Sequence, residues 1–351
     1  MGEESFAKEV GLRYVNCADK GILRKGSGKR FYYVDENGKR VTDEGTLARI
    51  KSLVIPPAWK EVWICKQANG HLQCTGRDLR GRKQYRYHAD WSKGRNETKF
   101  EKLERFGKIL PELRERVEKD LTRPGMDKER VLAAVVQLME HTGMRVGNDE
   151  YAETNESYGA TTIRNHHAKV SGEKVKIKFK GKSGVAHDLE LKDKRLAKII
   201  RRCQDLPGQE LFAYEAEDGT VRDVGSADVN EYLQNATGER ITAKDIRTWV
   251  GSVRAIEALW ELGKVDYESL TKKACRDREC AVIKGAASFL GNTVAVCRKY
   301  YVHPGVFEAD RSGVLHRPRG VPKASEGLSP AEAMLLGLLR KKKKCEARRA
   351  A

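Results

Sequence analysis

Five polar side chains, far apart along the chain, are of the types that can bind and transfer a phosphodiester. They are Arg145 before Val-Gly-Asn, Lys182 within Gly-Lys-Ser-Gly, Arg247 within Lys-Asp-Ile-Arg-Thr-Trp, Asn292 within Gly-Asn-Thr, and Tyr301 nine residues later. Arginine donates bidentate hydrogen bonds to phosphate oxygens and stays charged when partly buried. Nearby cations favour the reactive phenolate form of tyrosine, whose ordinary pKa is about 10. This set can therefore hold a phosphodiester while a tyrosine attacks the phosphorus.

The same residues also have ordinary structural interpretations. Arg145 and Arg247 lie beside helical patterns, where arginines are common. Lys182 can be a solvated turn lysine, and Asn292 can cap the helix that follows it. Most tyrosines pack in cores or interfaces, and this applies to both members of the 300–301 pair. The hypothesis of a catalytic site therefore depends on the order of all five residues.

Residues 76–88 form a second cluster, in which basic and aromatic side chains are interleaved next to a turn. We expect Gln84, Tyr85 and Tyr87 to face base edges or sugars of DNA, while the basic side chains contact phosphates. Those basic residues are Arg77, Arg80, Arg82 and Lys83. The alternative is a basic edge strand whose charges discourage aggregation.

The composition favours a polyanionic partner. The chain has 351 residues, enough for two or three domains, and its 68 Lys and Arg against 50 Asp and Glu give a formal net charge of +18. This excess indicates nucleic acid first and an anionic membrane surface second. No segment approaches the roughly 20 apolar residues that cross a bilayer, and the start of the chain has no apolar export signal. We therefore expect no membrane association.

The chain offers no pattern for a metal or a cofactor. Its eight cysteines include no Cys-x-x-Cys pair, which argues against a zinc site, and no phosphate-binding loop motif is present. We predict no cofactor, no metal, and cysteines in the reduced state.

The first ninety residues have the pattern of strands and turns. Strand Arg30–Val34 precedes Asn37-Gly38, and two apolar stretches flank Asn69-Gly70; both dipeptides favour hairpins. Asp43–Leu53 predicts a short helix with Asp43 as its cap. Ser92–Thr98 is polar and lacks periodicity, so we predict a linker there.

Helical spacing of apolar residues dominates from about residue 99 onward. The clearest segments are Glu129–Met144, Asp245–Leu262 and Ala281–Leu290. Ser329-Pro-Ala-Glu332 is a capping box that begins a short helix, Ala331–Leu339. We expect the basic tail beyond that helix to be solvated and frayed.

A small sheet interrupts the helical region. Lys174–Lys180 alternates strictly between lysine and apolar residues, which predicts a strand with one buried face. Val185–Leu191 can return as its partner, and Thr161–His166 can add a third strand. This places Lys182 at the tip of a hairpin, where a lysine can reach into a groove and give a proton to a leaving oxygen.

Together these motifs resemble the type IB DNA topoisomerases, specifically the small bacterial and poxvirus-like branch. The matching motifs are Ile55-Pro-Pro-Ala-Trp59, the 76–88 cluster, Arg145-Val-Gly-Asn148, Phe179-Lys-Gly-Lys182, Lys244-Asp-Ile-Arg247-Thr-Trp249, and Asn292 to Tyr301. The resemblance implies an α+β protein that forms a clamp around duplex DNA. Its parts would be a β-rich DNA-binding domain at 1–92, a mostly helical catalytic domain with a small antiparallel sheet at 93–328, and a short helix with a basic tail at 329–351.

The resemblance also implies a role for each residue. Arg145, Lys182 and Arg247 match the catalytic basic residues of the family. Asn292 matches a position that is His in poxvirus members and often Asn in bacterial ones. Tyr301, and not Tyr300, matches the nucleophile through its nine-residue spacing from Asn292. The implied N-terminal DNA contacts are Gln84, Tyr85 and Tyr87.

The chain departs from the family pattern at two positions. Val294 stands where proline is expected, and Cys297 lies one helical turn before Tyr301. Neither change removes a catalytic group. With Asn at 292 the contact to the phosphate oxygen is neutral, so the two arginines carry more of the charge.

The implied activity is relaxation of supercoiled duplex DNA by single-strand transesterification through a 3′-phosphotyrosine, without ATP or metal. A tyrosine site-specific recombinase would use similar chemistry, but recombinases usually carry His-x-x-Arg where this chain has Lys244-x-x-Arg247. A basic chromosomal DNA-binding protein would explain the charge and not the order of the five residues. The expected partner is double-stranded DNA, bound by a monomer in the bacterial cytoplasm at the nucleoid, or in a viral setting.

Overall fold

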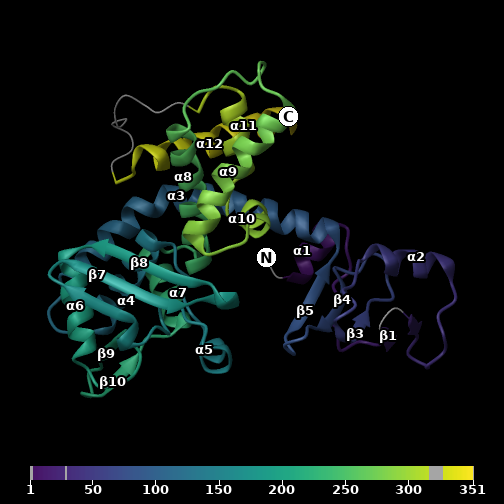
Figure 1. The fold of residues 1–351 in the computed structure, drawn as a ribbon, viewed down its shortest axis with the longest axis horizontal. Coiled ribbons are helices and arrows are strands. Elements are labelled where there is room, and N and C mark those ends of the chain that lie inside the picture. Colours follow the sequence, from purple (N-terminus) through teal and green to yellow (C-terminus); the bar gives the residue numbers. More distant parts are fainter. Residues whose placement is uncertain (1–2, 28–29, 316–326, 351) are drawn as a thin grey trace. The chain divides into compact units, whose positions relative to one another are not determined.

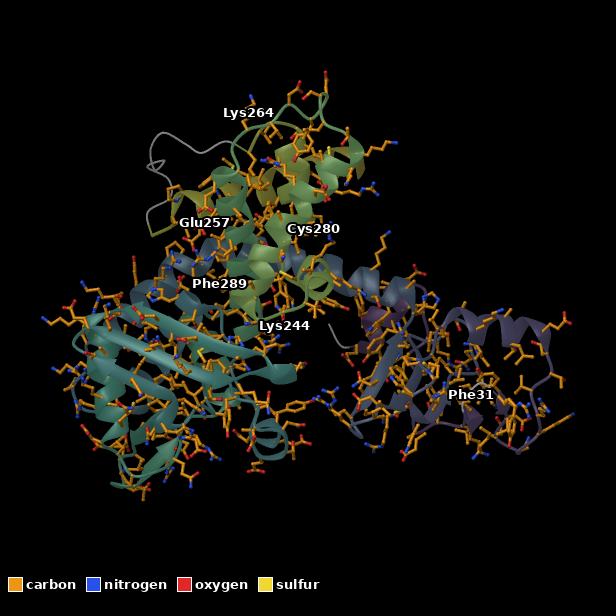
Figure 2. The ribbon with its side chains drawn as sticks, in the orientation of Figure 1. Phe31, Lys244, Glu257, Lys264, Cys280 and Phe289 are labelled. Carbon is orange, nitrogen blue, oxygen red and sulfur yellow. The ribbon has the colours of Figure 1, made fainter. Side chains whose placement is uncertain are left out.

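The computed structural model describes residues 3–27, 30–315 and 327–350. The chain divides into two compact units, Met1–Lys99 and Phe100–Ala351. The first unit is built mainly on strands and the second mainly on helices, so the predicted α+β class is confirmed. Figure 1 follows the chain through both units, and Figure 2 adds the side chains in the same orientation.

The first unit is a five-stranded antiparallel sheet with strand order β2-β1-β3-β4-β5. The elements are α1 Glu3–Glu9, β1 Ile22–Ser27, β2 Arg30–Val34, α2 Glu44–Ser52, β3 Lys60–Ile64, β4 Leu72–Arg77 and β5 Lys83–Tyr87. The hairpin predicted around Asn69-Gly70 is confirmed, because β3 pairs with β4 and places Ile64 opposite Cys74. Strand β5, which carries the second half of the 76–88 cluster, is at the edge of the sheet.

Two other local predictions for this unit have different outcomes. Asp43 is the N-cap of α2 and accepts a hydrogen bond from the Thr46 amide at 2.7 Å, as predicted. Asn37-Gly38 forms a turn, but the chain returns only as an isolated bridge between Val34 and Arg40.

The predicted linker at Ser92–Thr98 is wrong, because the segment lies inside a long helix, α3 Ala89–Leu121. The segment contains no proline, and its one glycine is required by packing. A Cβ on Gly94 would lie 2.9 Å from Cζ of Phe6, whose ring also meets the Trp91 ring edge-on at 5.1 Å. Tertiary contacts thus outweigh the cost of about 1 kcal/mol for a glycine within a helix. The boundary between the two units falls within α3.

The second unit contains a three-stranded antiparallel sheet of order β6-β7-β8. Its strands are β6 Ala168–Ser171, β7 Lys174–Lys180 and β8 Ala186–Lys192. The predicted hairpin is confirmed, since β7 and β8 pair up to Lys180 opposite Ala186 and leave Lys182 in the connecting turn. The predicted third strand at Thr161–His166 is wrong, and β6 takes its place. Thr161 instead donates its amide to the Val146 carbonyl at 2.6 Å, so this segment supports the loop after Arg145.

The helices of the second unit enclose a single large core cluster. Those that reach the candidate site are α4 Lys128–Thr142, α5 Asp149–Asn155, α8 Ala243–Glu261, α9 Lys272–Leu290 and α10 Val294–Tyr300. The remaining elements are η1 Asn165–His167, η2 Lys182–Gly184, α6 Lys194–Gln204, β9 Ala213–Glu215, β10 Val221–Asp223, α7 Ser226–Thr237 and α11 Pro304–Arg311. The three helices predicted most clearly correspond to α4, α8 and α9. Figure 1 shows α8 and α9 side by side, and α8 also contacts α4.

The last helix, α12, runs Pro330–Ala350 and is longer than predicted. Its predicted capping box is confirmed, since the Ser329 amide donates to Glu332 Oε2 at 2.7 Å and the Glu332 amide donates to Ser329 Oγ at 3.3 Å. The expected end at Leu339 was too early because Lys, Arg, Glu and Ala, which dominate the tail, are strong helix formers. Within the described residues no single helix is long and apolar enough to cross a bilayer; α9 and α10 meet that test only together, with a 94° bend between them.

Candidate active site

The site is built where the C-termini of two helices meet. Helices α4 and α9 both end at a glycine in the left-handed conformation, Gly143 with φ 61° and Gly291 with φ 59°. A Cβ on Gly143 would lie 2.8 Å from Cδ2 of Leu290, so only glycine allows this approach. The last carbonyls of a helix have no partner within the helix, and they carry partial negative charge. The two ends therefore offer several oxygens that can hold cations.

Arg247 occupies these oxygens from the start of α8. Its side chain is only 3% exposed; Nη1 donates to the Gly143 carbonyl, and Nη2 donates to the Leu290 carbonyl at 2.9 Å. Burial lowers the pKa of Arg247 to about 10, and the charge of Arg145 adds to this effect. The guanidinium therefore stays protonated at neutral pH. Its Nε is buried and has no acceptor among the described residues.

Arg145 follows the end of α4 and lies against the end of α9. Its Nη1 and Nη2 donate to the Gly291 carbonyl at 3.3 and 3.4 Å, and Nη2 also donates to Asn292 Oδ1. Burial is the main cause that lowers the pKa of Arg145. The sequence left open whether Asn292 caps α10, and the structure assigns the cap to Thr293. Asn292 Nδ2 is buried and has no acceptor among the described residues.

Tyr301 ends α10 and is held against α8 through its backbone. The Ser252 hydroxyl donates to the Tyr301 carbonyl at 3.3 Å, and a Cβ on Gly251 would lie 2.6 Å from that oxygen. The Tyr301 ring centroid lies 5.1 Å from Cζ of Arg247. Both Gly251 and Ser252 escaped the sequence analysis, because a buried Gly-Ser pair within an apolar helix gives no local signal of function.

Lys182 approaches the site from the tip of the β7–β8 hairpin. Its side chain is exposed, and Nζ lies 5.7 Å from the centre of the Tyr151 ring on α5. The turn depends on Ser183 in a left-handed conformation, with φ 64°. Tyr151 was missed from the sequence, although it lies only six positions after Arg145.

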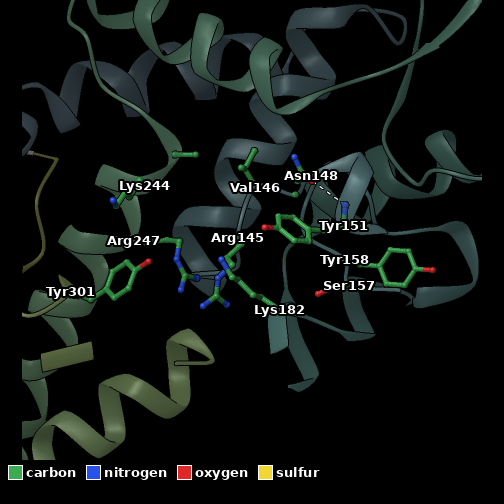
Figure 3. Close-up of a pocket in the computed structure, with 12 residues that line it drawn as sticks. Arg145, Val146, Asn148, Tyr151, Ser157, Tyr158, Lys182, Lys244, Arg247 and Tyr301 are labelled. Atoms are coloured by element: carbon green, nitrogen blue, oxygen red, sulfur yellow. Dashed lines mark hydrogen bonds between the residues drawn. The ribbon is translucent and has the colours of Figure 1, made fainter. Parts of the chain in front are cut away.

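One pocket of about 240 Å³ joins these elements. Figure 3 shows the residues that line it, among them Arg145, Lys182, Arg247 and Tyr301. The others are Val146, Gly147, Asn148, Tyr151, Ser157, Tyr158, Ala243 and Lys244. Tyr300 is not among them. None of the lining residues carries a carboxylate, and no group of His, Cys, Asp or Glu within the described part of the chain could hold a metal ion. Cations without a carboxylate suit a phosphate ligand.

The 76–88 cluster forms the β4–β5 hairpin of the first unit. Tyr85 and Tyr87 stack at 6.1 Å and are 47% and 45% exposed, and Lys83 Nζ lies 5.9 Å from the Tyr85 ring on the same side of the strand. Asp78 holds the turn, because its Oδ2 accepts from Arg82 Nε at 2.9 Å and from Gln84 Nε2 at 3.0 Å. In the same way, Arg77 donates to Glu61 Oε2 at 2.9 Å, while Arg80 is exposed.

Family models match both parts of the chain. The model described as eukaryotic DNA topoisomerase I, catalytic core, matches residues 88–308, a range that includes all five candidate residues. The model described as bacterial DNA topoisomerase IB, N-terminal domain, matches residues 30–78. The chain belongs to the type IB DNA topoisomerases.

Relatives of the enzyme span viruses and a fungus. The DNA topoisomerase 1B of Acanthamoeba polyphaga mimivirus is 34% identical over 288 residues, which cover 81% of this chain and 85% of the relative. The DNA topoisomerase 1B of Vaccinia virus (strain Copenhagen) is 24% identical over 252 residues, 71% of this chain and 75% of the relative. DNA topoisomerase 1 of Mycosarcoma maydis is 24% identical over 225 residues, 56% of this chain and 22% of the relative.

These matches confirm the predicted resemblance and the predicted enzyme class. The enzyme acts on duplex DNA as a type IB topoisomerase, and the alternatives of a recombinase and of a non-enzymatic chromosomal protein are set aside. Lys244, which the sequence marked as the difference from recombinases, lines the pocket one helical turn before Arg247.

Proposed function

We propose that Tyr301 is the nucleophile of the enzyme and that Arg145, Lys182, Arg247 and Asn292 assist it. The observation that carries this proposal is a pair of buried donors, Arg247 Nε and Asn292 Nδ2, that have no acceptor among the described residues. Arg247 lines the pocket together with Tyr301, and Asn292, which does not line it, accepts a hydrogen bond from Arg145, which does. A buried donor without an acceptor costs about 1–3 kcal/mol, so the site is suited to receive oxygens. The non-bridging oxygens of a phosphodiester are such acceptors, and their charge matches the two arginines.

In the proposed reaction the Tyr301 oxygen attacks a backbone phosphorus, and the bond between phosphorus and the 5′-oxygen breaks. The products are a 3′-phosphotyrosyl ester and a free 5′-hydroxyl. The phenol proton passes to solvent, and Lys182 gives a proton to the departing 5′-oxygen. Arg145, Arg247 and Asn292 bind the non-bridging oxygens most strongly when charge grows on them in the pentacoordinate transition state. This difference in binding lowers the barrier.

The ester intermediate accounts for relaxation without an energy source. While it persists, the cut strand rotates about the intact strand and releases supercoils. The 5′-hydroxyl then attacks the ester and restores the backbone. The ester conserves the energy of the original bond, so sealing requires no ATP. Two arginines supply the charge stabilisation that a metal ion gives in other phosphoryl-transfer sites.

The two neighbouring tyrosines provide the direct test. We expect Tyr301→Phe to bind duplex DNA and to leave a supercoiled plasmid unrelaxed in EDTA without ATP. Tyr300→Phe is the matched control, since its ring does not line the pocket, and it should relax the plasmid at the wild-type rate. Relaxation by Tyr301→Phe, or its loss in Tyr300→Phe alone, would overturn the assignment of the nucleophile.

We also propose that the first unit binds the same duplex through the 76–88 hairpin. The proposed contacts are Arg77, Arg80, Arg82, Lys83, Gln84, Tyr85 and Tyr87. The exposed Tyr85 and Tyr87 support contacts with sugars or bases, and the exposed Arg80 supports a contact with phosphate. We keep the functional division into a DNA-binding part at 1–92, a catalytic part at 93–328 and a C-terminal part at 329–351.

A single copy of the chain is proposed to suffice for catalysis, because all five candidate residues belong to one unit of one chain. The bacterial type of the N-terminal family model and the viral relatives support a bacterial nucleoid or a virus as the place of action.

A further inference from the structure

His187 lies against the backbone at Gly181 and Gly291, beside Lys182 and Asn292, without lining the pocket. It is on β8, directly opposite Phe179 on β7, and the two rings stack with their centroids 4.7 Å apart and their planes 6° from parallel. Stacking against a strand neighbour fixes the plane of the imidazole ring. The side chain is partly buried, so the ring has little freedom to turn toward solvent.

The edge of this ring fills the space between two glycines. A Cβ on Gly181 would lie 2.7 Å from both Cδ2 and Nε2 of His187. A Cβ on Gly291 would lie 2.5 Å from Cε1 and 2.8 Å from Nε2. The ring is therefore in close contact with both backbones, and each position excludes any larger residue while the ring is present.

These two glycines belong to opposite sides of the site. Gly181 directly precedes Lys182 in the hairpin turn, and the Gly181 amide donates to the Val185 carbonyl at 2.7 Å to close that turn. Gly291 directly precedes Asn292, and its carbonyl accepts hydrogen bonds from Arg145. One side chain thus touches the segment that carries the lysine and the segment that holds the phosphate-binding groups.

The electrostatic surroundings favour the uncharged form of the ring. Burial is the main cause that lowers the pKa of His187, and the charges of Arg145 and Arg247 lower it further. At neutral pH the ring therefore adds no third positive charge beside the two arginines. Its contribution is its shape and its contacts.

We propose that His187 is a positioning residue, whose ring sets the spacing between the Lys182 turn and the Gly291–Asn292 turn. This inference rests on the proposed function of Lys182 as the proton donor. Removal of the ring would let the hairpin tip shift toward the end of α9. Proton delivery to the 5′-oxygen would then suffer, while the arginines would still hold the phosphate from the helix ends. A displacement of about 1 Å can lower a rate by about 10²-fold.

The test compares two leaving groups in single-turnover cleavage of a duplex. One substrate has the natural 5′-oxygen at the cleaved bond, and the other has sulfur there. A thiol has an ordinary pKa of about 8.5 and leaves without a proton donor. We expect His187→Ala to cleave the oxygen substrate about 10- to 100-fold more slowly than the wild type and the sulfur substrate within about 3-fold of it. His187→Phe, which keeps a flat stacked ring, should retain most of the activity on both.

Leu189→Ala is the matched control. Leu189 is on the same face of β8, two positions from His187, and it packs against the core away from the turn. It should lose stability without a preference between the substrates. If His187→Ala slows both substrates equally, or if Leu189→Ala shows the same preference, the positioning role is overturned.

Two further variants distinguish a failure of the inference about His187 from a failure of the proposed function of Lys182. Lys182→Ala should cleave the sulfur substrate at close to the wild-type rate. If it does not, the proposed role of Lys182 as the proton donor is wrong, whatever the result for His187→Ala. If Lys182→Ala is restored and His187→Ala is not, the inference about His187 fails alone. Should His187→Ala not fold, Gly181→Ala places a methyl group in the space of the ring, and it should produce the same preference for the sulfur substrate. Equal slowing of both substrates by Gly181→Ala would contradict the inference.

Discussion

Arg114, which is partly buried, and Arg247, which is fully buried, are held in the second unit in opposite ways. Arg114 on α3 contacts Glu140 and pairs with Glu332 Oε1 at 2.7 Å. Burial alone would lower the pKa of Arg114, but the two carboxylates outweigh it and raise the pKa above its usual value. Arg247 has no carboxylate partner among the described residues: it donates to the Gly143 and Leu290 carbonyls and interacts with Tyr301, and burial lowers its pKa to about 10.

The two arginines differ in how much of their charge is available to a ligand. The charge of Arg114 is neutralised inside the protein, and the Trp249 indole completes the network by donating to Glu332 Oε1 at 3.1 Å. No carboxylate among the described residues pairs with Arg247, so its charge remains available to a ligand in the pocket that it lines. Trp249 and Arg247 lie on the same helix, α8. One helix therefore carries the residue that anchors it to α12 and the residue that we propose binds the phosphate.

The largest expected effect on the cleavage rate comes from replacing the Arg247 guanidinium with an ammonium group. Arg247→Lys keeps the charge, but an ammonium cannot span the Gly143 and Leu290 carbonyls and still present a further donor. We expect the single-turnover cleavage rate to fall by about 10²–10³-fold, equivalent to about 2.7–4 kcal/mol. Rapid-quench measurement of the covalent DNA adduct checks this, with DNA affinity as the control. A rate within 3-fold of the wild type would mean that charge alone suffices.

The next effect concerns the paired arginine and should leave the chemistry intact. Glu332→Gln removes one carboxylate from Arg114, and we expect the free energy of unfolding at pH 7 to fall by about 3 kcal/mol. The cleavage rate of the folded variant should change little, because Arg247 keeps its own partners. Glu308→Ala, an exposed glutamate on α11, is the control and should lie within about 0.5 kcal/mol of the wild type.

Acid should remove this difference in stability. Burial opposes ionisation of Glu332, but its hydrogen bond and charge interaction with Arg114 outweigh burial, so the pKa is lowered below its usual value. The native state thus binds this proton less readily than the unfolded state does. The stabilisation is complete above a pH of about 4.3, and it is lost as the pH falls through the lowered native pKa. Urea unfolding of the wild type and of Glu332→Gln should therefore give free energies of unfolding that converge as the pH falls. A difference that stays constant with pH would contradict the ion pair between Glu332 and Arg114 as its source.

Parts of the candidate site could be predicted from the sequence where they depend on residues that are close together in the chain. Strict alternation in 174–180 predicts Lys182 at a hairpin tip. The choice of Tyr301 over Tyr300 came from the resemblance to the family, and it agrees with the lining of the pocket. The helix that precedes Arg145 was visible in its apolar face. These features depend on neighbours within a few residues, which sequence patterns record.

Contacts between distant segments were not predictable. Gly251 matters because the Tyr301 carbonyl lies against it, and His187 matters because two glycines from different elements close around its ring. The polar segment Ser92–Thr98 gives no local sign of its helix, which is supported by packing of Trp91 against Phe6, far earlier in the chain. In each case the deciding partner is remote in sequence, so no local periodicity reveals it.

The smallest expected effect extends the comparison to the basic hairpin of the first unit. Arg77 pairs with Glu61 and so resembles Arg114, whereas Arg80 is exposed and has no ion pair within the described residues. Arg80→Gln should lower the slope of log affinity against log salt by about 1, because one phosphate contact is lost. The double variant Arg77→Gln with Glu61→Gln removes both charges, and it should lower the slope by less than Arg80→Gln does, because Glu61 already offsets part of the charge that Arg77 brings to the DNA. Fluorescence anisotropy with a labelled duplex measures both slopes. An equal drop in the two proteins would show that an exposed arginine paired with a carboxylate still binds phosphate. The contrast between Arg114 and Arg247 would then not extend to exposed side chains.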